Sequence, residues 1–239
     1  MQPLYIIKTG STFPDVVRKF GDFDAWVQTA LGPVNFEIRT LDVHSDPKLP
    51  EAEACAGVII TGSHAMVTDA LPWSLRLEAW IPSLLARSIP LLGICYGHQL
   101  LARATGGEAG FHPLGEEIGT VTIQRLPESQ DDPLFGILPH FFQVHATHAQ
   151  TVLRLPPQAI RLAANDHEPT HAFRLGSCAW GVQFHPEYTA DIMRAYVEKE
   201  NSTLRKGRIQ REDKGNGVRD TPEAARLMHL FARLVEKGL

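Results

Sequence analysis

Short apolar runs alternate with longer amphipathic stretches through the first hundred residues of the chain. The apolar runs predict β-strands at residues 4–7, 36–41, 57–61 and 90–94. The last two runs are continuous, which is typical of strands buried on both faces of a parallel sheet. Between the strands, helices are predicted at residues 24–31, which end before Gly32, and at residues 74–87, where apolar side chains recur at helical spacing. This order predicts an α/β fold with a mostly parallel central sheet flanked by helices, and it places a ligand site at the carboxyl ends of the strands.

The pattern changes after the glycine pair at residues 106–107, where short β-prone segments follow one another. These segments are residues 119–125, 141–145, 151–155, 161–164, 172–175 and 179–184. They predict a small antiparallel β extension. Two further helices are predicted at residues 188–204 and 222–237, with a charged loop rich in Gly and Asn between them. We therefore expect residues 1–204 to form one α/β domain, and residues 205–239 to add the charged loop and a C-terminal helix packed on the same domain.

The composition is that of an ordinary globular protein, because 44% of the 239 residues are hydrophobic, 21% are charged and the net charge is −4. No apolar run approaches the length of about 18 residues that a membrane-spanning helix needs, and Lys8 interrupts the first hydrophobic stretch too early for a signal peptide. The three cysteines include no C-x-x-C pair, which argues against a disulfide framework and against a thiolate zinc site. These features indicate a cytoplasmic protein with no membrane partner. The charge balance gives no reason to expect nucleic acid, and the basic stretch at residues 205–211 is interpreted as a solvated loop.

A candidate nucleophile follows the fourth predicted strand. Residues 93–97 read Gly-Ile-Cys-Tyr-Gly, the pattern of a sharp strand-to-helix turn with a nucleophile at its apex. Glycines on both sides allow the backbone to turn sharply and expose the side chain of Cys95 at the strand end. Its sulfur would then lie at a helix N-terminus, which favours the reactive thiolate. A buried structural cysteine is the competing interpretation, and we favour it for Cys55 and Cys178, which lack flanking glycines.

A candidate base and its orienting group stand together in the His-Pro-Glu segment at residues 185–187. Pro186 disfavours the helical region for His185, so this segment is expected to be extended. Alternation along an extended chain directs His185 and Glu187 to the same side. The carboxylate can then hold the imidazole Nδ1–H and leave Nε2 free to face a cysteine sulfur. An isolated His-Pro-Glu also fits a surface turn.

Together, the motifs GICYGHQ and GVQFHPE, about ninety residues apart, resemble the class I glutamine amidotransferase family. The resemblance extends upstream to Ile-Ile-Thr-Gly-Ser at residues 59–63. Within the family the chain looks most like the amidotransferase domain of GMP synthase and its stand-alone relatives. The resemblance implies that Cys95 is the nucleophile, His185 the base and Glu187 its orienter. It also implies hydrolysis of the side-chain amide of L-glutamine through a cysteine thioester, which gives glutamate and ammonia.

The same resemblance implies how a substrate would be bound. The N–H groups of Gly62 and Tyr96 would form the oxyanion hole, and the side chain of Gln99 would contact the bound glutamine. The remaining substrate loop of the family would fall at residues 144–148, at His145 and Ala146, where Ala146 replaces a glycine of the family. Neither a cofactor nor a metal is implied.

Ammonia needs an acceptor, but the sequence contains neither a phosphate-binding loop motif nor a dinucleotide fingerprint. We therefore expect either a glutaminase that serves a separate synthetase subunit, or a free-standing hydrolase of a γ-glutamyl peptide or amide. A catalytically silent regulatory module is an alternative of another class, and the three polar residues of the implied triad argue against it. A metal site is a further alternative, because two histidine pairs have ligand-like spacing: His145 with His148, and His167 with His171. Pro169 lies within the second pair and disfavours a shared helix face.

Overall fold

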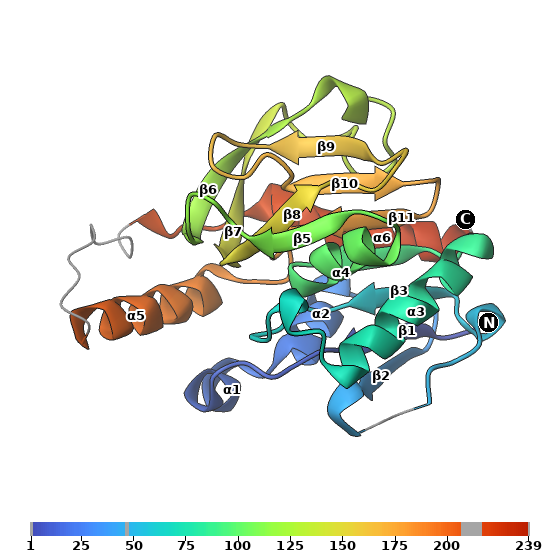
Figure 1. Ribbon diagram of the computed structural model, residues 1–239, viewed down its shortest axis with the longest axis horizontal. Helices are drawn as coiled ribbons and strands as arrows, with labels where there is room; N and C mark the ends of the chain where they lie inside the picture. Colours follow the sequence, from blue (N-terminus) through green and yellow to red (C-terminus); the bar gives the residue numbers. More distant parts are fainter. Residues whose placement is uncertain (1, 46–47, 207–216, 239) are drawn as a thin grey trace.

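A single large sheet organises the fold (Figure 1). The computed structural model describes residues 2–45, 48–206 and 217–238, with only the backbone of residues 200–206. Within these residues, nine strands pair in the order β2-β1-β3-β4-β11-β10-β9-β6-β7. The strands are β1 (Leu4–Lys8), β2 (Ile38–Asp42), β3 (Gly57–Ile60), β4 (Leu91–Ile94), β6 (Glu117–Arg125), β7 (Phe141–His148), β9 (Ile160–Ala164), β10 (Ala172–Leu175) and β11 (Ala179–Val182). The first five strands of this order are parallel and the other four join antiparallel, so the predicted fold class is confirmed.

The helices and a second small sheet complete the described structure. The second sheet pairs β5 (Glu108–Phe111) with β8 (Gln150–Arg154) in antiparallel fashion. The helices are α1 (Pro14–Phe20), α2 (Phe23–Leu31), α3 (Pro72–Ala86), α4 (Tyr96–Ala104), α5 (Ala190–Lys206) and α6 (Pro222–Lys237). Sequence patterning missed α1, which buries only Val16, and β5, which contains a glycine. The predicted basic stretch lies outside the described residues from residue 207 onward.

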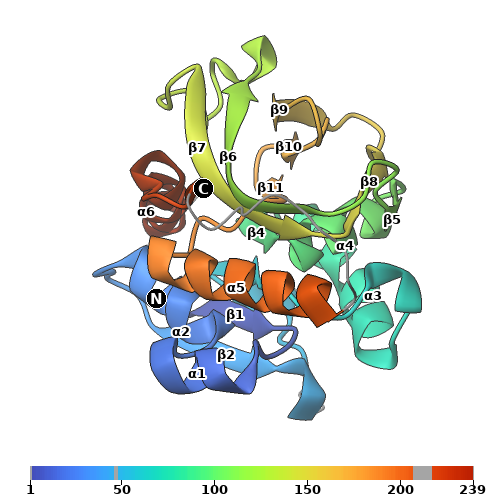
Figure 2. The ribbon, with the colours of Figure 1, turned by 90° about the vertical axis from the view of Figure 1, so that its left-hand side faces the viewer.

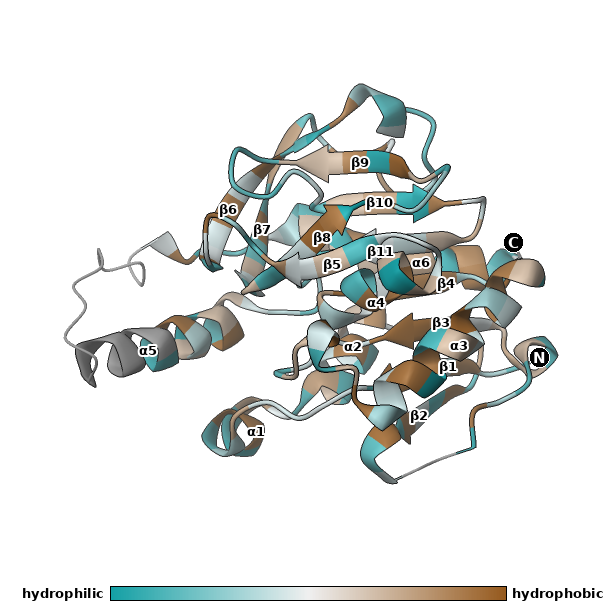
Figure 3. Ribbon diagram, viewed as in Figure 1, coloured by the Kyte–Doolittle hydropathy of each residue, from teal (hydrophilic) through white to brown (hydrophobic). Residues whose placement is uncertain are grey.

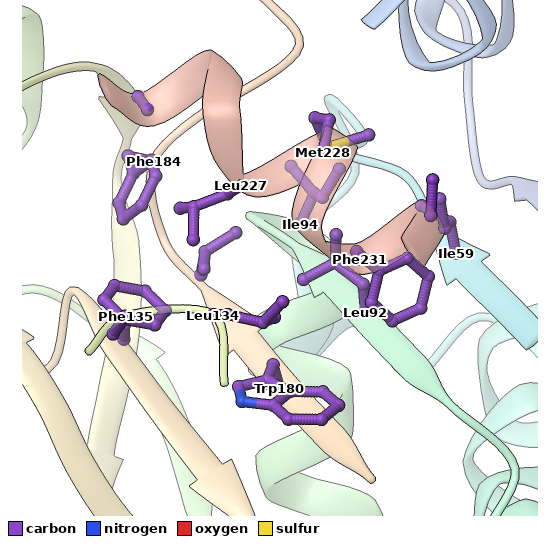
Figure 4. Close-up of a cluster of buried hydrophobic side chains, with 14 of the residues drawn as sticks. Ile59, Leu92, Ile94, Leu134, Phe135, Trp180, Phe184, Leu227, Met228 and Phe231 are labelled. Carbon is purple, nitrogen blue, oxygen red and sulfur yellow. The ribbon is translucent and has the colours of Figure 1, made fainter. Parts of the chain in front are cut away.

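The two faces of the sheet pack against different helices. Along β1, Leu4 and Ile6 point into a cluster with α2 and α6, whereas Tyr5 and Ile7 point into a cluster with α3 and α4. Figure 2 shows α6 and α4 on opposite sides of the central strands, and Figure 4 shows α6 side chains packed over β4 and β11. Each aliphatic side chain buried in this way contributes about 1.5–3 kcal/mol to the stability of the fold. Burial on both faces explains why β3 is apolar along its whole length (Figure 3).

The three central parallel strands end side by side. Gly93 of β4 is in register with Ile60 of β3 and with Gly181 of β11. Because the strands are parallel, the segments that leave their carboxyl ends meet at one edge of the sheet. Those segments carry three of the residues singled out in the sequence, which are Gly62, Cys95 and His185.

The C-terminal helix α6 packs on α2 and β7. It lies where the sequence predicts a helix, and its buried face includes Leu227, Met228 and Phe231. The division into residues 1–204 and 205–239 stays a prediction. None of the helices in the described part of the chain is long and apolar enough to cross a membrane.

The α6 interface allows a test of which burial stabilises the fold. Leu227 is 1% exposed, and we expect Leu227→Ala to lower the free energy of unfolding by about 2–5 kcal/mol, because a cavity forms in the core. Leu75 on α3 is 47% exposed, and Leu75→Ala should change the same quantity by about 0.5 kcal/mol or less. Urea denaturation followed by circular dichroism measures both. Equal losses in the two variants would contradict this account of the core.

Candidate functional site

Cys95 stands at a strained turn between β4 and α4. Its backbone has φ 50° and ψ −96°, a conformation that non-glycine residues rarely adopt. The turn is tight, because a Cβ on Gly93 would collide with the carbonyl of Gly97, and a Cβ on Gly97 would lie 2.5 Å from the carbonyl oxygen of Ile60. Only glycine fits both positions. The structure therefore has the sharp strand-to-helix turn that the sequence predicts, with the cysteine at its apex.

His185 and Glu187 form a buried pair beside this turn. The Nδ1 atom of His185 lies 2.8 Å from Oε1 of Glu187, and the two residues are 2% and 4% exposed. Burial by itself lowers the pKa of His185, but the charges of Glu187 and Cys95 and the hydrogen bonds to both outweigh burial and raise this pKa to about 10. Since Glu187 holds Nδ1, the other ring nitrogen is the one available to Cys95. This raised pKa favours the imidazolium form at neutral pH, next to the sulfur.

Gly62 allows the nucleophile and the base to approach each other. A Cβ on Gly62 would lie 2.9 Å from Cε1 of His185 and 3.7 Å from Cβ of Cys95, so a side chain here would push into both. Tyr96 is the first residue of α4, where backbone N–H groups point out of the helix. Its side chain is buried in the core instead, and its hydroxyl bonds Oγ of Ser74 at 2.6 Å. Tyr96 can therefore serve the site only through its backbone.

A cavity of about 270 Å³ opens at Cys95. Its lining includes Cys95, Tyr96 and Gln99 together with side chains from distant segments, which are Phe13, Ser63, His64, Ala65, Met66, Glu116, Ile118, Thr147, His148, Ala149, Gln150, Tyr196 and Lys199. The volume is near the lower end of small-molecule pockets, which span about 300–1,000 Å³. Such a size suits a metabolite as small as an amino acid.

The structure places the two predicted substrate-loop residues outside the lining of this cavity. His145 and Ala146 belong to strand β7, where they pair with Thr120 and Gly119 of β6, and both are fully buried. Neither residue lines the cavity, which is lined instead by the following segment, residues 147–150. The reason is that the β6–β7 ladder covers the earlier residues. His145 contributes differently, because its carbonyl accepts a hydrogen bond of 2.8 Å from the backbone N–H of His185.

Gln99 lines the cavity, and its amide nitrogen is already engaged. Its Nε2 donates to the carbonyl of Gln150 at 2.8 Å and to Oε1 of Gln183 at 3.0 Å. These bonds connect α4 to the start of β8 and to the segment after β11. Gln99 therefore ties the nucleophile's helix to the opposite wall of the cavity.

Sequence reasoning missed an aromatic wall beside the base. The ring of Tyr188 stacks on the imidazole of His185, with centroids 4.1 Å apart and an interplanar angle of 24°. Tyr196 lies next to it, at a centroid distance of 5.2 Å, and its hydroxyl is 3.1 Å from Nε2 of His64. Burial, followed by the charge of His185, lowers the pKa of His64. The only sequence signal for this wall is the eight-residue spacing of the two tyrosines near the start of α5, which suits one helix face.

The histidines considered as metal ligands are otherwise engaged. Nε2 of His148 lies 3.2 Å from Oε2 of Glu117, and Nδ1 of His145 lies 3.2 Å from Oγ1 of Thr120. His171 directly precedes strand β10 and lies on no helix. Across the part of the chain that the structure describes, no three or more His, Cys, Asp or Glu side chains are grouped so that they could hold a metal ion.

Known proteins are similar to this chain in sequence and in fold. The family model for glutamine amidotransferase class-I matches residues 17–201. The GMP synthase of Aeropyrum pernix is 39% identical over 139 residues, which are 58% of this chain and 25% of that protein. A glutamine-hydrolysing GMP synthase subunit of Haloarcula marismortui is 32% identical over 177 residues, which are 72% of this chain and 84% of that protein. Gamma-glutamyl peptidase 4 of Arabidopsis thaliana is 29% identical over 155 residues, 64% of this chain and 62% of that protein.

The chain covers part of the full-length relatives and nearly the whole of a solved structure. The chain spans only about a quarter of the full GMP synthases that it matches. A solved glutamine amidotransferase from Methylobacillus flagellatus superimposes with a TM-score of 0.76 over 100% of this chain and 96% of that one, at 24% identity. At this identity the likeness shows the shared fold alone.

The charged imidazole leads to a prediction about thiol reactivity. We expect iodoacetamide to alkylate Cys95 faster than Cys55, whose pKa burial raises to about 11, and faster than Cys178, whose pKa burial also raises. The imidazolium of His185 is retained below its raised pKa of about 10 and is lost above it, so its assistance should extend from neutral pH to about pH 10. Mass spectrometry of the labelled peptides measures each rate. In His185→Ala, alkylation of Cys95 at pH 7 should slow about tenfold, and an unchanged rate would show that the imidazole does not activate the sulfur.

Proposed function

Because this chain belongs to the class-I glutamine amidotransferase family, we propose that it hydrolyses the side-chain amide of L-glutamine through a thioester on Cys95. The chain is a cysteine-dependent amidohydrolase by its family and its glutamine-hydrolysing relatives. The observation that carries the proposal is the contact of Cys95, which lines a small cavity, with the buried pair of His185 and Glu187. Packing alone requires no such combination of a strained cysteine, an imidazole and a carboxylate.

The proposed first step uses the thiolate of Cys95 and the imidazolium of His185. The sulfur attacks the amide carbon of glutamine, a carbon–sulfur bond forms, and the carbonyl oxygen becomes an oxyanion. The carbon–nitrogen bond then breaks as His185 gives its proton to the leaving nitrogen, so that ammonia and a γ-glutamyl thioester result. In the second step the neutral imidazole takes a proton from water, the hydroxyl attacks the thioester, and glutamate and the thiolate are released.

The groups around the reacting carbon support these steps. The backbone N–H groups of Gly62 and Tyr96 are assigned to the oxyanion, where each donor is worth about 3 kcal/mol in other enzymes. Glu187 acts as orienter, since it bonds Nδ1 of His185 and stabilises the imidazolium. Gln99 and residues 147–150 form the wall that would face the rest of the glutamine molecule. In this assignment residues 147–150 replace His145 and Ala146 as the substrate-facing segment.

Ammonia released here requires an acceptor, and we assign that role to a separate synthetase subunit. The likeness to the glutamine-hydrolysing GMP synthase subunit of Haloarcula marismortui, 84% of which is covered, favours this arrangement. The three free cysteines, Cys55, Cys95 and Cys178, are consistent with the reducing conditions of the cytoplasm, where we place the protein.

Hydrolysis of a larger γ-glutamyl amide is the second candidate. The cavity is also lined by Phe13, Tyr196 and Lys199, and the ammonium of Lys199, paired with Asp15 at 2.5 Å, places a cation on the α5 side. A cation and aromatic rings suit a leaving amine that carries its own carboxylate, such as a peptide. The likeness to gamma-glutamyl peptidase 4 of Arabidopsis thaliana favours the same interpretation.

The proposed nucleophile leads to a direct test. Cys95→Ser should lower the rate of glutamate release from L-glutamine by at least about 10³-fold, because the hydroxyl does not ionise beside His185 as a thiol does. A coupled glutamate dehydrogenase assay measures release, with and without added synthetase chains. The matched control is Cys178→Ser, a buried cysteine remote from the cavity lining, which should keep the wild-type rate. Wild-type turnover in Cys95→Ser would disprove the mechanism.

Substrate competition separates the two candidates. At equal concentrations, the wild-type protein should hydrolyse glutamine with a kcat/KM about tenfold or more above that for a γ-glutamyl dipeptide, if the leaving group is ammonia. Chromatographic quantification of the released amines measures both rates in one mixture. A preference for the dipeptide would establish the second candidate in place of the first.

A further inference from the structure

A buried group of acids and imidazoles adjoins the cavity wall. Glu117 at the start of β6 is its centre, and His148 at the end of β7 connects it to the cavity. The Oε2 atom of Glu117 lies 3.2 Å from Nε2 of His148 and 3.1 Å from Nε2 of His171. Its Oε1 atom accepts a bond of 2.8 Å from the side-chain amide of Asn165. The mechanism above assigns no role to Glu117, His171 or Asn165.

The hydrogen bonds of His148 require two ring protons. Nδ1 of His148 lies 3.0 Å from the carbonyl oxygen of Gln150, which can only accept. Nε2 faces the carboxylate of Glu117, which when ionised also only accepts. Both nitrogens must therefore donate, so His148 is an imidazolium as long as Glu117 is ionised. Burial raises the pKa of Glu117, but the hydrogen bonds from His148 and His171 outweigh it and bring this pKa below its usual range.

Other titratable groups face His148 from the neighbouring elements. Oε2 of Glu168, between β9 and β10, lies 3.9 Å from Nδ1. The rings of His112 and His171 lie at centroid distances of 6.3 Å and 6.2 Å. His98 on α4 is fully buried, and burial, with smaller contributions that include the charge of His148, lowers its pKa. Two carboxylates thus lie within 4 Å of the His148 ring.

The carbonyl that His148 holds is a junction in the cavity wall. The oxygen of Gln150 accepts from His148 and also from Nε2 of Gln99, at 2.8 Å. The side chain of Gln150 bonds the backbone N–H of Val67 at 3.0 Å. At the other end of this segment, the carbonyl of Thr147 lies 3.8 Å from Sγ of Cys95. This carbonyl therefore joins the segment of residues 147–150 both to His148 and, through Gln99, to the nucleophile's helix.

We propose that Glu117 is a positioning residue for the glutamine pocket, which holds His148 doubly protonated so that its ring fixes the Gln150 carbonyl and with it the wall formed by residues 147–150. This proposal rests on the proposed function, because it assigns residues 147–150 to the substrate. His148 itself is 4% exposed, so the effect reaches the substrate through the backbone that it holds. The side chain at position 117 then affects the binding of glutamine more strongly than the rate at which the bound amide reacts.

The proposal is tested with Glu117→Gln, which keeps the shape of the side chain and removes its charge. We expect the KM for glutamine to rise about tenfold while kcat changes less than about threefold, because a charge-assisted bond to the wall is lost and the triad is not. Nitrogen-15 NMR of labelled histidine should show both ring nitrogens of His148 protonated in the wild type and one deprotonated in the variant. The matched control is His171→Gln, which removes the other imidazole that faces Glu117 and leaves the bonds of His148 in place.

A merely structural role for the cluster would give a different result. In that case Glu117→Gln and His171→Gln would lower the melting temperature and kcat together, with no separate change of KM. Trapping provides a second readout, because Glu117→Gln should slow labelling of Cys95 by a chloroketone analogue of glutamine about tenfold and leave labelling by iodoacetamide unchanged. Equal slowing with both reagents would overturn the proposal.

The proposed function and this inference fail in different ways. If the wild-type protein neither hydrolyses glutamine nor reacts with its chloroketone analogue, the proposed function is wrong, and the NMR signals of His148 still decide the inference. A neutral His148 ring in the wild type, or a doubly protonated ring that persists in Glu117→Gln, would overturn the inference whatever the activity.

Discussion

The sharp turn at Cys95 is the constraint on which the rest of the site depends. The backbone of this residue is held at a positive φ by a close approach that Gly93 and Gly97 alone permit. Such strain persists only where the surrounding structure imposes it, and here it is imposed by β4, which is paired on both sides in the middle of the parallel sheet. The same pairing brings the segments after β3 and β11 to the turn. A sheet in which β4 and β11 were not neighbours would leave the sulfur without its imidazole.

Two buried imidazole–carboxylate pairs flank the cavity, and they do different work. In the pair of His185 with Glu187, the second ring nitrogen is directed to the cysteine, so the pair belongs to the reacting centre. In the pair of His148 with Glu117, the second nitrogen is committed to a backbone carbonyl, so the pair fixes a wall. Burying charges is costly unless they are paired and hydrogen-bonded, and both pairs meet that condition. In each pair, the atom that the second ring nitrogen faces decides whether the pair takes part in the reaction or positions a wall of the cavity.

The cavity is assembled from segments that are far apart in the sequence. Residues near α1, the loop after β3, the end of β7 and the helix α5 all contribute side chains. Because of this construction, the residues that would recognise the substrate lie mostly on other segments than the turn that carries Cys95. Relatives that are named as GMP synthase subunits and as a γ-glutamyl peptidase are compatible with one nucleophile and different walls.

The sequence by itself determined the α/β class, the strand-to-helix turn and the side-by-side placement of His185 and Glu187, because each depends on local patterns of apolar residues, glycines and proline. It also indicated, through a family resemblance, that Cys95 and His185 belong together. Only the tertiary structure decided that residues 147–150, and not His145 and Ala146, line the cavity, because the register of β7 against β6 is set by long-range pairing. The contact of Glu117 with His148 likewise joins elements whose spacing along the chain carries no signal of contact. Local periodicity specifies which face of an element is buried, and the packing of whole elements specifies which buried side chains meet.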